Sequence, residues 1–135
     1  MTRTKPRDRV FLDANVLFSA AYRADSGLRR LWKYRSVALI TSGYAAEEAS
    51  RNLEDVDQQR RLGELLKKVE IVPESLGRHE PEGWNLLEKD RPILAAAIRA
   101  EATHLLTGDT RHFGHLMGST VEGVQVLRPA QYLRR

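Results

Sequence analysis

Short runs of consecutive apolar residues alternate along the chain with stretches in which apolar residues recur every three or four positions. The runs predict strands that are buried on both faces, and the recurring pattern predicts amphipathic helices. The expected strands are 9–13, 37–41, 69–72, 104–107 and 124–127. The expected helices are 14–19, 27–34, 43–53, 57–68, 92–101, 111–117 and a terminal helix that starts at Pro129. Because strands alternate with helices, the pattern predicts an α/β fold with a parallel sheet between two layers of helices.

The same pattern indicates a single domain. Across 135 residues there is no repeat, low-complexity segment or linker, and a chain of this length can bury a core of its own. Residues 1–8 are expected to form a short basic extension before the first strand. No apolar segment approaches the roughly 20 residues that span a bilayer, and Asp13 interrupts the apolar run near the start, which argues against a secretory signal. We therefore expect a cytoplasmic protein with no membrane contact.

Composition adds one functional indication. The chain has 22 Lys and Arg residues against 18 Asp and Glu residues, which gives a formal net charge of +4. A polyanionic partner such as RNA or DNA fits this excess, but an ordinary solvated basic surface fits it equally well. The chain has no cysteine, which excludes disulfides, thiolate metal sites and cysteine nucleophiles.

Four acidic residues stand at the ends or edges of the predicted elements. Asp13 and Asp109 follow two of the apolar strands, and Asp90 precedes the helix RPILAAAI. In the helix after position 42, Glu48 borders the apolar face, whereas Glu47 lies on the polar face. Functional sites of parallel α/β sheets gather beyond the carboxyl ends of the strands, so we expect the side chains of Asp13, Glu48, Asp90 and Asp109 to converge there.

Carboxylates that converge need a counter-charge. Two like charges about 4 Å apart at a protein surface repel each other by about 4 kcal/mol. Because the predicted ligands are oxygens and the chain lacks cysteine, the matching cation is hard, namely Mg²⁺ or Mn²⁺. A cation held by carboxylates activates water and binds a phosphodiester for in-line displacement. The acids and the basic surface together predict a metal-dependent nuclease.

Other interpretations of these residues stay open. Taken alone, Asp13 could cap the end of a strand and Asp90 could cap a helix, without any chemistry. A phosphotransferase that forms an aspartyl phosphate also places an acid at a strand end. Such an enzyme usually needs a second acid at position 15, where Asn15 stands, or a lysine at a strand end, and neither is present. A binding module that keeps the fold without catalysis is a further alternative. Histidine is not required for any of these, and His112 is expected to pack or hydrogen-bond at the surface.

Four stretches, in this order, resemble those of the PIN-domain ribonucleases: DANVLFSA near the start, S-x-x-x-x-x-E with a leucine five residues beyond, DRPILAAAI, and LLTGDTRHFG. Within that family the chain is similar to the toxin components of bacterial toxin–antitoxin pairs. The resemblance extends from Val10 to about Leu127. It implies a three-layer α/β/α sandwich with a central, mainly parallel sheet of five strands, and cleavage of single-stranded RNA with Mg²⁺ or Mn²⁺.

The resemblance also implies roles for individual residues. The catalytic and metal-binding acids of the family fall on Asp13, Glu48, Asp90 and Asp109. The polar residues that support them fall on Asn15 and Thr107. Some members carry a further acid shortly after the last one, and those positions here are Thr110 and Arg111, so the number of metal ions stays open. Beside the acids, Arg91 and Arg111 are candidates for contacts with RNA phosphates, or else they screen the carboxylates.

Partners follow from the same resemblance. It implies a homodimer and an antitoxin protein, whose acidic segment a basic cleft would attract. Two alternatives remain: an RNA-processing nuclease outside a toxin–antitoxin pair, and a catalytically silent RNA-binding module of the same fold. The sequence does not indicate the RNA target.

Overall fold

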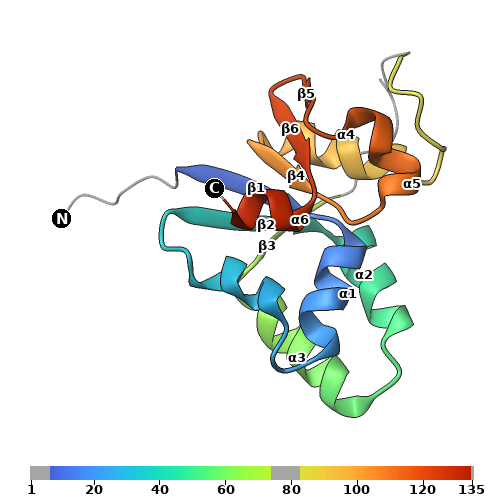
Figure 1. Ribbon diagram of the computed structural model, residues 1–135. Coiled ribbons are helices and arrows are strands. Elements are labelled where there is room, and N and C mark those ends of the chain that lie inside the picture. The colour runs from blue at the N-terminus through green and yellow to red at the C-terminus, as the bar shows by residue number, and fades with distance from the viewer. Residues whose placement is uncertain (1–6, 74–82, 135) are drawn as a thin grey trace.

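A sheet of six strands forms the centre of the molecule in the computed structural model, which describes residues 7–73 and 83–134 (Figure 1). The strands are β1 (Asp8–Leu12), β2 (Val37–Ser42), β3 (Glu70–Val72), β4 (His104–Leu106), β5 (Thr120–Val121) and β6 (Val124–Leu127). Their order across the sheet is β3-β2-β1-β4-β6-β5. All neighbouring strands are parallel except β5, which pairs with β6 in the antiparallel direction.

Helices cover both faces of this sheet. They are α1 (Ala14–Tyr22), the 3-10 helix η1 (Gly27–Lys33), α2 (Gly43–Asn52), α3 (Val56–Leu66), α4 (Arg91–Arg99), α5 (Thr110–Phe113), the 3-10 helix η2 (Gly114–Leu116) and α6 (Pro129–Leu133). In Figure 1, α1, α2 and α3 lie together on one face of the sheet and α4 lies on the other. The predicted α/β/α sandwich with a mainly parallel sheet is therefore confirmed. None of the helices in the described part of the chain has the length and apolarity needed to cross a membrane.

The predicted count of five strands is wrong, because β5 had not been expected. Two residues are too few to leave an alternating pattern in the sequence. Instead, the strand is created by the turn at Glu122 and Gly123, whose φ angles are 46° and 88°. Positive φ at both positions is typical of the tight two-residue hairpin turn, and it places Val121 opposite Val124.

Some boundaries also differ from the expected ones. The first strand begins at Asp8 rather than at position 9. Of the expected basic extension at 1–8, residues 1–6 lie outside the described part of the chain. The segment expected as a helix at 27–34 is a 3-10 helix, which Ser26 caps by accepting a hydrogen bond from the backbone N–H of Leu28. The helix expected at 111–117 is divided between α5 and η2.

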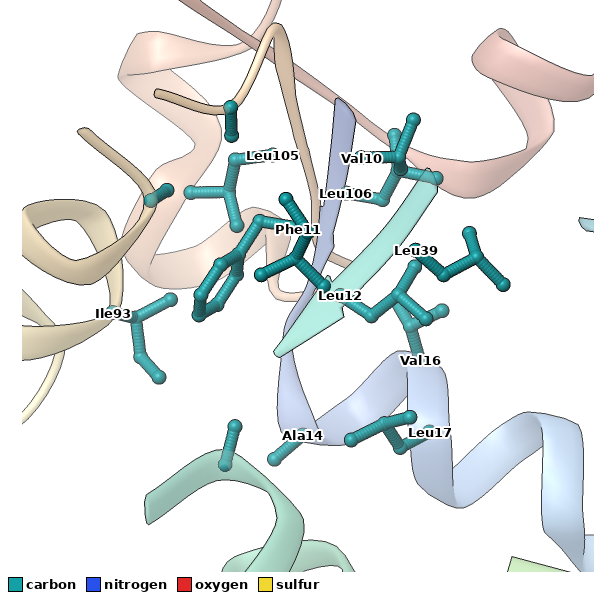
Figure 2. Packing of buried hydrophobic residues seen from close by; sticks show 14 of the residues in the cluster. Val10, Phe11, Leu12, Ala14, Val16, Leu17, Leu39, Ile93, Leu105 and Leu106 are labelled. Carbon is teal, nitrogen blue, oxygen red and sulfur yellow. The ribbon is translucent and has the colours of Figure 1, made fainter. Parts of the chain in front are cut away.

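The core explains why the acid at position 13 stands where it does. β1 is the third of six strands across the sheet, with β2 on one side and β4 on the other, and Val10, Phe11 and Leu12 are completely buried. Figure 2 shows Phe11 pointing toward Ile93 of α4, and because successive side chains alternate, Leu12 faces the opposite layer. The last three residues of β1 are buried and apolar, so the next polar side chain, Asp13, comes directly after the carboxyl end of the strand.

Candidate active site

Asp13 lies at the end of β1, only 6% exposed, and three donors reach its carboxylate. Oδ1 accepts a hydrogen bond from the backbone N–H of Ala14 at 2.7 Å. Oδ2 accepts hydrogen bonds from the Thr107 hydroxyl at 2.8 Å and from the Asn15 side-chain amide at 3.2 Å. Asp13 therefore does cap α1, as the structural interpretation of this residue requires, but its second oxygen is directed toward the end of β4.

Asn15 and Thr107 join the carboxyl ends of β1 and β4. The Asn15 amide donates to the Thr107 hydroxyl at 3.3 Å, and its oxygen accepts from the backbone N–H of Gly108 at 2.7 Å. The Thr107 hydroxyl also accepts from the backbone N–H of Asp109 at 3.1 Å. The approach at Gly108 is close, because a Cβ placed there would lie 3.3 Å from Asn15 Oδ1. These contacts fix the loop that carries Asp109 beside Asp13.

The charge on Asp13 is strongly affected by its surroundings. Burial raises its pKa to about 6; the hydrogen bonds from Thr107 and Ala14 lower it, and the charges of Glu48 and Asp90 raise it further. Burial is also the largest cause of the raised pKa of the Tyr44 hydroxyl, and the charges of the same two acids raise it further. Glu48 and Asp90 therefore lie close enough to Asp13 for their charges to act on it.

Helix α2 presents one glutamate toward this region. Glu48 is partly buried, whereas Glu47 is exposed, as the apolar face of the helix predicts. Ser42 fixes the start of α2 by accepting a hydrogen bond from the backbone N–H of Ala45 at 3.1 Å. This cap sets the rotation of the helix, and with it which of the two glutamates faces Asp13.

Asp90, Asp109 and His112 form a compact cluster. The ring nitrogen Nδ1 of His112 lies 2.8 Å from Asp109 Oδ2 and 3.1 Å from Asp90 Oδ2. The three side chains are 14% (Asp90), 27% (Asp109) and 21% (His112) exposed. One ligand atom from each residue lies within 4.8 Å of the other two, so the cluster could hold a metal ion. His112, which was expected only to pack or hydrogen-bond at the surface, thus lies between two of the proposed acids.

The position of Asp90 does not match that of an ordinary helix cap. It precedes α4 at the N-cap position, yet its side chain makes no capping hydrogen bond. Its carboxylate is directed instead toward His112, and Oδ2 is buried without a hydrogen-bond partner in the described part of the chain. Burial raises the pKa of Asp90, the charges of His112 and Lys89 lower it, and that of Asp109 raises it.

The two arginines proposed for phosphate contacts differ in their surroundings. Arg91 is partly buried, and its Nε donates to the backbone carbonyl of Leu86 at 3.1 Å, so part of its role is to hold the segment before α4. Arg111 is exposed on α5, two residues after Asp109. Only the exposed arginine therefore has its whole side chain available to a ligand beside the acids.

A hollow next to Asp109 adds an arginine that the sequence analysis missed. Apolar side chains of Val16, Leu28 and Pro129 line it together with the polar Asn15, Asp109 and Arg128. Arg128 is exposed and directly follows β6, the parallel neighbour of β4. Sites of parallel sheets lie beyond the carboxyl ends of the strands. Applied to basic residues as well as to acids, this rule predicts Arg128.

Comparison with known proteins identifies the family. The family model of the PIN domain matches residues 9–111. The chain belongs to the PIN domain family. PIN domains are generally nucleases. The matched segment of this PIN domain includes all four proposed acids and ends one residue before His112.

A solved structure shares the fold. It is the crystal structure of VapBC2 from Rickettsia felis bound to a DNA fragment from their promoter, of which one chain superposes with a TM-score of 0.58. The match covers 89% of this PIN domain and 98% of that chain, at 17% sequence identity. A search of curated proteins finds no match. At this identity the structural likeness shows the fold alone.

Proposed function

We propose that this PIN domain is a metal-dependent endoribonuclease that cleaves single-stranded RNA. The observation that carries the proposal is the cluster of Asp90, Asp109 and His112, with Asp13 and Glu48 near enough for charges to act between the acids. Glu48 and Asp90 act on the charge of Asp13, and Asp90 shares the ring of His112 with Asp109. Acids gathered in this way repel one another, and a nuclease that binds a cation makes use of that arrangement.

The residues present fit a bound divalent cation. Buried polar atoms in proteins nearly always have a partner, yet Asp90 Oδ2 and His112 Nδ1 have no hydrogen-bond partner among the described residues. We assign Asp13, Glu48, Asp90 and Asp109 as the residues that would hold Mg²⁺ or Mn²⁺. When bound, the cation supplies activation of water and neutralisation of phosphate charge.

The chain's own residues complete the proposed mechanism. Asn15 and Thr107 hold Asp13 and the loop of Asp109 in position through the hydrogen bonds between β1 and β4. We assign Arg111 and Arg128, both exposed near Asp109, as contacts for RNA phosphates. The apolar part of the hollow next to Asp109 favours a single strand, because unpaired bases can lie against apolar side chains and paired bases cannot.

The cellular role that we propose is that of the toxin in a toxin–antitoxin pair. The four family stretches in the sequence support it, and so does the fold shared with VapBC2. The net charge of +4 would attract an acidic segment of an antitoxin protein. A homodimer is also proposed. Light scattering at high concentration should report twice the mass of the chain, and a strict monomer would remove this part of the proposal.

The proposed reaction can be tested with end-labelled RNA. Single-stranded RNA should be cut internally in Mg²⁺ or Mn²⁺, EDTA should abolish cleavage, and a duplex of the same sequence should be cut much more slowly. Asp13→Asn should reduce cleavage by several orders of magnitude, corresponding to a loss of roughly 4 kcal/mol or more of transition-state stabilisation. Cleavage by Asp13→Asn at the wild-type rate would contradict the assignment, whereas RNA binding without cleavage by the wild type would indicate a silent binding module.

A further inference from the structure

We propose that His112 is a nitrogen ligand of the metal centre, and that this centre therefore binds Mn²⁺ more tightly than Mg²⁺. The inference rests on the metal site of the proposed function and deepens it by choosing between the two cations. It gives His112 a role that neither the family stretches nor the four acids indicate.

The ring of His112 lies between two carboxylates. His112 Nδ1 lies within 2.8 Å of one carboxylate oxygen and 3.1 Å of another, from Asp109 and Asp90. Although both distances are short, neither contact has the geometry of a hydrogen bond, and Nδ1 has no hydrogen-bond partner within the described ranges. The ring nitrogen therefore faces both oxygens at ion-pair distance, without hydrogen-bond geometry toward either.

The separations between the ring nitrogen and the two carboxylate oxygens are those of ligands around a common ion. Mn²⁺ and Mg²⁺ hold their ligands at roughly 2.1 Å in octahedral arrangements, so two adjacent ligand atoms lie about 3 Å apart. The two nitrogen–oxygen distances agree with that spacing, and all three candidate ligand atoms lie within 4.8 Å of one another.

The backbone imposes this position on His112. Asp109 caps α5 by accepting a hydrogen bond from the backbone N–H of His112 at 3.1 Å. Residues three apart in a helical turn lie on the same side, which brings the two side chains together. Phe113, completely buried, anchors the short helix in the core. Together, the cap and the buried Phe113 keep the ring beside Asp109.

The chemical consequence concerns the choice of metal. Imidazole nitrogen is a good ligand for transition-metal ions, whereas Mg²⁺ strongly prefers oxygen. A site that offers one imidazole nitrogen among carboxylates should favour Mn²⁺, and removing the nitrogen should reduce that preference.

The test measures metal binding by the full chain without RNA. Titrations should show that wild type binds Mn²⁺ more tightly than Mg²⁺. In His112→Ala the affinity for Mn²⁺ should fall by roughly tenfold or more, and that for Mg²⁺ by roughly threefold or less. His115→Ala is the matched control, because His115 is exposed and contacts the backbone carbonyl of Trp84 rather than the acids. An equal loss for both metals in His112→Ala would overturn the inference.

A spectroscopic measurement keeps the inference testable even if His112→Ala does not fold. Pulsed electron paramagnetic resonance of Mn²⁺ bound to wild type should detect directly coordinated nitrogen. The signal should change when histidine is labelled with ¹⁵N. Bound Mn²⁺ without coupling to histidine nitrogen would show that the ring only accompanies the acids, and would overturn the inference.

These outcomes separate the inference from the proposed nuclease function. RNA cleavage together with an all-oxygen Mn²⁺ site would overturn the role of His112 and leave the function intact. Nitrogen-coordinated Mn²⁺ without RNA cleavage would support the role of His112 and contradict the function. A protein that binds neither Mn²⁺ nor Mg²⁺ would contradict both.

Discussion

Burial raises the pKa of Asp13 and its hydrogen bonds lower it, and the balance of the two predicts how the stability of the protein depends on pH. Burial is the larger influence, and it places the pKa of the folded protein at about 6, above the ordinary value of 3.8. A carboxyl group whose pKa is raised on folding contributes its full stability below the unfolded pKa, and this contribution is lost as the pH rises through the folded pKa. Without metal, Asp13 should therefore cost the native state increasing free energy between about pH 4 and pH 6.

This dependence can be isolated by comparison with Asp13→Asn. In EDTA, the free energy of unfolding of wild type relative to Asp13→Asn should decrease by on the order of 3 kcal/mol between pH 4 and pH 7, because each unit of pKa shift corresponds to about 1.4 kcal/mol. Urea titrations across this range measure the difference. Parallel curves for the two proteins would show that Asp13 has the same pKa in the folded and unfolded states.

The two neighbouring glutamates of α2 should differ in their importance. Glu48 acts on the charge of Asp13, whereas Glu47 is exposed to solvent. Glu48→Gln should therefore lose most of its RNA cleavage. Glu47→Gln should keep cleavage close to wild type and change stability by no more than about 0.5 kcal/mol. Initial cleavage rates of both variants, with folding checked by circular dichroism, provide the measurement, and the reverse result would mean that α2 is rotated by one residue.

Asp90 should be a cost to stability when no metal is bound. Its environment raises its pKa, and its side chain makes no capping hydrogen bond that a substitution could remove. Asp90→Asn should consequently be inactive and yet melt at a higher temperature than wild type in EDTA. Saturating Mg²⁺ should narrow the difference, because a ligand that binds only the native state stabilises it by RT ln(1 + [L]/Kd). Thermal melts of both proteins with and without Mg²⁺ measure this difference. A lower melting temperature of Asp90→Asn than of wild type in EDTA would identify Asp90 as a structural residue.

Among the elements, β1 and β4 are joined by side chains as well as by their backbone ladder. Thr107 is completely buried and connects the ends of both strands. Its hydroxyl donates to Asp13, which follows β1, and accepts from the backbone N–H of Asp109, which follows β4. Thr107→Val keeps the shape but removes these two hydrogen bonds and the one that the hydroxyl accepts from the Asn15 amide, so it should reduce the free energy of unfolding by roughly 1–3 kcal/mol. It should also raise the pKa of Asp13 further, because the hydroxyl lowers it.

Thr110→Val is the matched control for this substitution, because Thr110 is exposed. Urea titrations of both variants and a titration of the Asp13 carboxyl by nuclear magnetic resonance would test the expectation. Equal stability of Thr107→Val and Thr110→Val would show that the hydroxyl does not connect the two strands energetically.

The elements that the sequence could predict are those whose determinants are local. Consecutive apolar residues identify β1, and the apolar face of α2 distinguishes Glu48 from Glu47. The hairpin of β5 depends instead on backbone angles at Glu122 and Gly123, which no hydrophobic pattern reports. The cluster of His112 with Asp90 could not be predicted for a related reason: this contact joins the start of α4 to α5, and only the tertiary arrangement brings those segments together.

At the scale of the whole molecule, the hollow next to Asp109 should govern the binding of RNA. Arg128→Ala, in an Asp13→Asn background that prevents cleavage, should weaken binding of single-stranded RNA several-fold for any sequence. It should also reduce the slope of log affinity against log salt by about 0.7, as expected for the loss of one phosphate contact. Arg99→Ala is the control, because Arg99 is exposed at the C-terminal end of α4, whereas Asp90 of the acidic cluster precedes its N-terminal end. Fluorescence anisotropy measures both quantities, and identical salt slopes would exclude Arg128 from the binding surface.

The place of β1 in the sheet determines when an active molecule can exist during synthesis. Its first neighbour, β2, is made soon afterwards, but its other neighbour, β4, begins at His104. At the usual translation rate of roughly 5–20 residues per second, the ribosome takes several seconds or more to reach it. Until then one edge of β1 is unpaired, and Asp13 lacks the hydroxyl of Thr107. A nascent chain therefore cannot complete the surroundings of Asp13 until most of it has been made, and the nuclease that we propose would be inactive throughout this interval.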